Sequence, residues 1–150
     1  MRPTVQDLAV VAGETGFLPG TIEKVVRLMS LFDGFNAHPF LRSRLALKGG
    51  TAINLFSDNV PRLSVDIDLN YIRSPDLEGM RAERPQLEQA IQDVCRREDI
   101  AVRHVPVGHA GGKWRLAYSD SEGNPGSLEL DINFLLRTPL WPVSKAECKP

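Results

Sequence analysis

Residues 63–71 read LSVDIDLNY, with apolar and polar side chains in alternation. Successive side chains of a β-strand point to opposite faces of the sheet, so this alternation is typical of a strand with one buried face. The apolar set is Leu63, Val65, Ile67 and Leu69, and the polar set is Ser64, Asp66, Asp68 and Asn70. We therefore expect a half-buried strand that presents Asp66 and Asp68 on its open face.

Two carboxylates at this spacing can act together. Residues two apart on a strand lie about 6.5 to 7 Å apart at the backbone, and flexing of their side chains lets both reach shared cations. Carboxylate oxygens are the hard ligands that Mg²⁺ prefers. Taken alone the pair is weak evidence, because a solvated strand face also carries such pairs.

A glycine-rich turn precedes this strand at Lys48-Gly49-Gly50-Thr51. It lies where a short helix over residues 52–56 is expected to begin. Glycines allow close approach of the backbone, and the free amides at a helix N-terminus suit a phosphate. The alternative is a tight turn in which the glycines serve only backbone geometry.

A third acid, Asp131, lies in a later alternating stretch, residues 127–136. Its apolar side chains point one way, whereas Asp131 lies on the polar side. Residues 113–118 form another strand candidate, and the turn-rich residues 120–126 predict that these two strands form an antiparallel hairpin. If the 127–136 strand lies beside the 63–71 strand in one sheet, Asp131 shares a face with Asp66 and Asp68.

Helical periodicity marks three further stretches. The expected helices cover residues 4–16, 21–34 and 85–98, with Pro75 and Gly79 interrupting the chain before the last one. Residues 100–107 are expected to form another strand, and the pattern at 42–47 assigns no conformation. We find no repeat and no second domain, so the 150 residues are expected to form one domain.

Together these motifs resemble the AbiEii/AbiGii toxin family, the MenT-like nucleotidyltransferases of the DNA polymerase beta-like superfamily. The resemblance rests on KGGTAINLF at 48–56, RLSVDIDL at 62–69 and LDI at 130–132. It implies an α+β nucleotidyltransferase fold, in which a mixed β-sheet is flanked by helices. The implied reaction transfers a nucleoside monophosphate from a nucleoside triphosphate to an acceptor, with loss of pyrophosphate.

The resemblance also implies roles for particular residues. Asp66, Asp68 and Asp131 would be the catalytic, metal-binding carboxylates of a two-Mg²⁺ site, and Asp131 would double as the general base. The expected nucleotide-binding residues are Lys48, Gly49, Gly50, Thr51 and Ser64. For Ser64 a cross-strand hydrogen bond is the alternative, and for Lys48 a solvated position.

The implied acceptor is the 3′ end of tRNA, and the implied partner is a separately encoded antitoxin. Two alternatives stay open: a small hydroxylated molecule or a protein as acceptor, and a non-catalytic remnant that binds nucleotide or a partner. The remnant is considered because the family's C-terminal helical part, with a further Lys and an Arg-Asp-type motif, is expected to be missing. Lys113 or Lys145 is a candidate to supply a phosphate-binding cation instead.

The overall charge restricts how the chain can meet nucleic acid. Eighteen basic and nineteen acidic residues give a net charge of −1, so any such contact needs a local basic patch. One candidate patch is Arg96, Arg97, Arg103 and His104, for which the alternative is a solvated helix end. The two cysteines and three histidines show no metal-binding spacing. With no signal peptide or membrane span expected, the location is predicted to be cytoplasmic.

Overall fold

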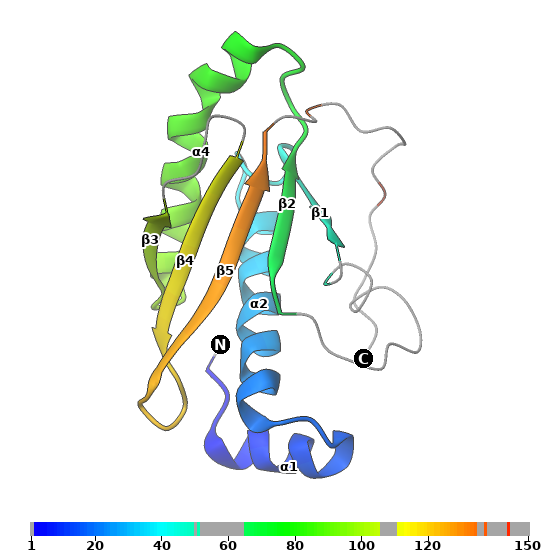
Figure 1. Ribbon diagram of the computed structural model, residues 1–150, viewed down its shortest axis with the longest axis vertical. Coiled ribbons are helices and arrows are strands. Elements are labelled where there is room, and N and C mark those ends of the chain that lie inside the picture. Colours follow the sequence, from blue (N-terminus) through cyan, green and yellow to red (C-terminus); the bar gives the residue numbers. More distant parts are fainter. Residues whose placement is uncertain are drawn as a thin grey trace.

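The computed structural model describes residues 2–49, 51, 65–105, 111–134, 137 and 144. These residues form three helices and five strands, arranged as one sheet with helices packed against it (Figure 1). In chain order the elements are α1 (Val5–Thr15), α2 (Pro19–Ala37), β1 (Leu45–Lys48), β2 (Ile67–Tyr71), α4 (Leu77–Arg97), β3 (Ala101–Val105), β4 (Gly111–Ser119) and β5 (Pro125–Asn133).

The sheet is mixed, and its strand order is β1-β2-β5-β4-β3. β2 and β5 are parallel neighbours at its centre, and every other neighbouring pair is antiparallel. The expected hairpin is confirmed as β4–β5, and the expected neighbourhood of the two aspartate-bearing strands is confirmed as β2–β5. This is the mixed sheet flanked by helices that the sequence predicts.

One face of the sheet is covered by α2 and α4, which lie behind it in Figure 1. The alternation of the strands explains which side chains fill the space between sheet and helices. In β5 the side chains of Leu128, Leu130 and Ile132 are buried, whereas Glu129 and Asp131 are exposed. The polar side chains therefore stand on the face that these helices do not cover.

The first helix follows its sequence signals closely. The Thr4 side chain accepts a hydrogen bond from the Asp7 amide, and the Asp7 carboxylate accepts one from the Thr4 amide. This reciprocal pair satisfies two amides that have no partner within the helix. The helix ends at Thr15 and is capped by Gly16, whose φ of 76° is left-handed and whose amide donates to the Ala12 carbonyl.

The start of α4 corrects one expectation. We expected a helix from Pro85, after breaks at Pro75 and Gly79, but α4 begins at Leu77. The Asp76 side chain caps it by accepting from the Gly79 amide, and Met80 in the added first turn is buried in the core. Capping and burial thus offset the backbone hydrogen bond lost at Pro85.

Other boundaries shift by a few residues. β4 and β5 begin two residues before their expected starts, and β5 ends at Asn133. Residues 45–48, within and beside a stretch that had no assigned conformation, form β1. The expected helix over 52–56 lies outside the described residues, as do the first residues of the 63–71 strand.

A buried ion pair connects α2 to the β4–β5 hairpin. Arg27 donates to Glu23 at 2.8 Å. Both side chains are buried, with exposed fractions of 4% for Arg27 and 2% for Glu23. Arg27 also donates to the Ser119 carbonyl, and Glu23 accepts from the Ser121 amide. The Arg27 guanidinium stacks on the Tyr118 ring at 4.1 Å. These contacts fix the helix against the hairpin.

Candidate active site

The candidate site is a row of charged residues that crosses four strands of the sheet. Lys48 of β1 is the register partner of Asp68 in β2, which is the partner of Asp131 in β5. Asp131 is in turn the partner of Lys113 in β4. Neighbouring strands lie about 4.8 Å apart, so the two aspartates are adjacent and a lysine stands on each outer side.

All four residues share the face that α2 and α4 leave open. Their neighbours in the strands, including Ile67, Leu69, Leu130 and Trp114, are buried, and side chains alternate between faces. The sequence prediction that Asp131 comes to the same side of the sheet as Asp68 agrees with this register. Asp66 precedes the first residue of β2 and is exposed.

The electrostatic environment of Asp68 reflects this crowding. Partial burial raises the pKa of the Asp68 carboxyl, and the charge of Asp131 raises it further. The positive charge of Lys48 lowers this pKa, and that of Lys113 lowers it more weakly. The charge of Asp66 raises it. Adjacent carboxylates repel each other, so a cation placed between them would be favoured.

The glycine turn lies directly beside Asp68. Gly49 has a φ of 79°, and a Cβ atom built at this position would lie 2.8 Å from Asp68 Oδ2. A larger residue would therefore be strained and would displace the carboxylate. The Thr51 hydroxyl donates to the Asp66 carbonyl oxygen, so the end of the turn is held against the start of β2.

The remaining predicted nucleotide-binding residues, Gly50 and Ser64, lie outside the described residues. Thr51 is buried and its side chain points to backbone, so a direct contact with triphosphate is left as a prediction. The structure thus brings together Lys48, Gly49, Asp68 and Asp131. It leaves the roles of the nucleotide-binding set untested.

The structure adds residues that the sequence did not connect with the site. Lys113 was only one of two candidate cations, because nothing in the sequence fixed the β4–β5 register that places it opposite Asp131. Its Nζ lies 3.4 Å from Glu129 Oε2. Asn70 was noted only as a polar strand residue. Among the residues that the structure describes, its buried Oδ1 has no hydrogen-bond partner, and Asn70 is in register with Asn133.

The donor set fits a hard divalent cation. Asp68 and Asp131 offer carboxylate oxygens on adjacent strands, and Asp66 lies two residues before Asp68. Partial burial and, after it, the charge of Asp131 raise the pKa of Asp68. In the ranges that the structure describes, no three His, Cys, Asp or Glu side chains are already gathered as a metal site. The complete three-carboxylate set is therefore still a prediction.

No helix of the described chain is both long and apolar enough to cross a membrane.

These features define a class: an α+β protein whose mixed sheet carries carboxylates on a central parallel strand pair, as in a nucleotidyltransferase fold. A family model described as nucleotidyl transferase AbiEii toxin, type IV toxin–antitoxin system, matches residues 30–150. The chain belongs to this AbiEii nucleotidyl transferase toxin family. Neither the curated proteins nor the solved structures gave a match.

Proposed function

We propose that this protein is a Mg²⁺-dependent nucleotidyltransferase that transfers a nucleoside monophosphate from a nucleoside triphosphate to the 3′ end of tRNA. It would act as the toxin of a toxin–antitoxin pair in the cytoplasm, held in check by its antitoxin. The family supports a nucleotidyltransferase toxin. The observation that carries the proposal is the direct register of Asp68 with Asp131 beside the Gly49 turn.

In the proposed reaction, the acceptor hydroxyl oxygen forms a bond to the α-phosphorus. The bond from this phosphorus to the bridging oxygen breaks, and its electron pair leaves with pyrophosphate. Asp66, Asp68 and Asp131 would hold two Mg²⁺ ions, which when bound polarise the α-phosphate and neutralise the departing charge. Asp131 also accepts the proton of the hydroxyl at a carboxylate oxygen.

The other residues of the site bind and orient. Lys48 and the backbone of Gly49 and Gly50 receive the triphosphate on the β1 side of the carboxylates, with Thr51 and Ser64 completing this set. Lys48 supplies a positive charge beside the transferred phosphate, because it is the register partner of Asp68. Holding both substrates in place supplies much of the rate acceleration in phosphoryl chemistry.

The test is transfer from each of the four α-labelled nucleoside triphosphates to bulk tRNA, with and without Mg²⁺. We expect Asp68→Asn to lower transfer by about a thousandfold, since it removes charge stabilisation of the transition state. Asp33→Asn is the matched control, because Asp33 is exposed on α2, behind the sheet. Equal transfer by the wild type and Asp68→Asn would contradict the proposal.

The acceptor alternatives are separated in the same assay. If label appears on a protein or on a small hydroxylated compound while RNA stays unlabelled, the protein is a nucleotidyltransferase whose acceptor is not RNA. Binding of triphosphate without transfer to any acceptor would favour a non-catalytic remnant.

A further inference from the structure

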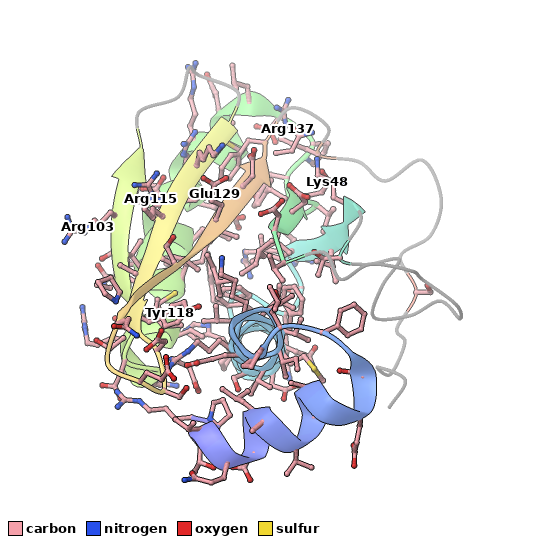
Figure 2. The ribbon with its side chains drawn as sticks, turned by 60° about the horizontal axis from the view of Figure 1, so that its bottom comes forward. Lys48, Arg103, Arg115, Tyr118, Glu129 and Arg137 are labelled. Atoms are coloured by element: carbon pink, nitrogen blue, oxygen red, sulfur yellow. The ribbon has the colours of Figure 1, made fainter. Side chains whose placement is uncertain are left out.

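The open face of the sheet carries a second charged row beside the aspartates. Arg103 of β3 is the register partner of Arg115 in β4, and Arg115 is the partner of Glu129 in β5. Figure 2 shows Arg103, Arg115 and Glu129 following one another across these strands, with Lys48 on the far side. Along the strands, this row lies two residues from the row that contains Asp131 and Lys113, so both rows are on the same face of the sheet.

Arg103 and Arg115 are two positive charges that lie directly opposite each other on neighbouring strands. Like charges directly opposite each other on a sheet repel, yet both side chains are exposed. In the described part of the chain, neither guanidinium makes an ion pair, a hydrogen bond or a cation–π contact. The nearest acid in register, Glu129, has its carboxylate beside Lys113 at 3.4 Å. An anion bound between the arginines would relieve this repulsion.

The basic cluster suggested by the sequence is divided by the fold. Arg96 and Arg97 lie in the last turn of α4, and Arg96 pairs with Asp93 at 3.3 Å. Arg103 instead lies on the open face and is joined there by Arg115, which comes from the next strand along the chain. The resulting surface is on the same face as Asp131, whereas the helix arginines belong to the element that covers the other face.

The two sides of the carboxylates differ. The Gly49 turn and Lys48 lie on the β1 side, and Lys113, Arg115 and Arg103 follow on the β4 and β3 side. Strand spacing places the Cα atoms of Arg115 and Arg103 about 8 and 12 Å from that of Asp131. In duplex DNA each strand carries one phosphate per ~3.4 Å of helix axis. A strand of similar phosphate spacing that has its terminal hydroxyl at Asp131 and runs from there across β4 and β3 would carry its next few phosphates over these arginines.

We propose that Arg103 and Arg115 bind the phosphodiester backbone of the acceptor RNA, so that the acceptor crosses β4 and β3 while the triphosphate occupies the β1 side. This rests on the proposed function and assigns its acceptor surface. Arginine suits the role because its planar fork binds two phosphate oxygens at once. The surface reads no base, so it fixes the path of the RNA and not its sequence.

The test is equilibrium binding of fluorescently labelled bulk tRNA between 50 and 200 mM salt, without nucleoside triphosphate, so no turnover enters. We expect Arg103→Gln/Arg115→Gln to weaken binding about tenfold to a hundredfold at the lowest salt. We also expect the slope of log affinity against log salt to become shallower by about 1.4 to 1.8, because each of the two phosphate contacts contributes about 0.7 on a single strand and about 0.9 on a duplex.

Two further variants separate charge from folding. Arg103→Lys/Arg115→Lys keeps both charges, and we expect it to keep most of the salt slope. Arg42→Gln/Arg81→Gln removes the same charge from two exposed arginines outside the strands, one in the turn before β1 and one on α4, and we expect wild-type binding. All variants are compared by thermal unfolding, which should change little because both arginines are exposed.

Unchanged affinity and slope in the Arg103→Gln/Arg115→Gln protein would overturn the assignment, as would equal losses in the Arg42→Gln/Arg81→Gln control. Failure of the proposed function gives a different result: transfer is absent or goes to an acceptor other than RNA, whatever the arginine variants do.

Discussion

At the scale of single residues, the electrostatics of Asp68 give a prediction that needs no substrate. The pKa of Asp68 is raised by burial and by Asp131, so the folded protein holds this proton more tightly than the unfolded chain. Its contribution to stability is therefore present below the unfolded pKa of about 3.9 and is lost as pH rises through the folded value. The ionised Asp68 works against folding at neutral pH.

We accordingly expect Asp68→Asn, in the absence of divalent cations, to be as stable as the wild type near pH 3.5 and more stable at pH 7. The gain should not exceed about 1 kcal/mol, because the site is partly solvated and water screens the repulsion. Urea unfolding at both pH values measures it. Added Mg²⁺ should stabilise the wild type and leave Asp68→Asn nearly unaffected. A larger stabilisation of Asp68→Asn than of the wild type by Mg²⁺ would contradict the proposed metal site.

The residues also show what alternation in the sequence can and cannot tell. The polar face of residues 66–70 and the place of Asp131 on the polar side of its strand follow directly from a period of two. The register that makes Asp68 and Asp131 direct partners does not, because it depends on how two strands separated by about sixty residues are brought together. For the same reason Lys113 was only one of two candidate cations, and Arg115 was not connected with the site.

At the scale of elements, the α2 contact with the hairpin is the feature least visible in the sequence. Glu23 and Arg27 are spaced as an ordinary surface pair on a helix, but both are buried and each also bonds the hairpin backbone. Their burial could not be predicted because it depends on the β4–β5 turn packing over the first half of α2. The start of α4 was missed because Asp76 caps a turn that contains Gly79.

We expect Arg27→Met to lower the free energy of unfolding by about 3 to 5 kcal/mol, because it leaves the Glu23 carboxylate buried without its counter-charge. Glu23→Leu/Arg27→Met removes both charges and should recover part of this loss. Arg96→Met tests an exposed pair and should change stability by less than about 0.5 kcal/mol. Urea unfolding gives all three values; an Arg27→Met effect as small as that of Arg96→Met would mean that the pair is solvated.

At the scale of the whole molecule, the core is one cluster that joins both large helices to the sheet. It includes Leu28 and Leu31 of α2, Leu87 and Ile91 of α4, and the inward side chains of β2, β4 and β5. Cys95 lies within this cluster with no exposed surface. Burial raises the pKa of the Cys95 thiol to about 12, and the charge of Glu98 contributes. Thiolate is the reactive form, so the folded protein should protect Cys95.

Labelling of Cys95 therefore reports how the core opens. In a Cys148→Ser protein, which carries a single thiol, we expect a disulfide reagent at pH 8 to react at least about a thousandfold more slowly than in urea-unfolded protein. If α4 leaves the sheet only when the whole core unfolds, the labelling rate will rise with urea along the slope of global unfolding. A shallower slope would show that α4 opens alone. In that case the helix would be a separate unit of stability, and the sheet would hold Asp68 and Asp131 in register without it.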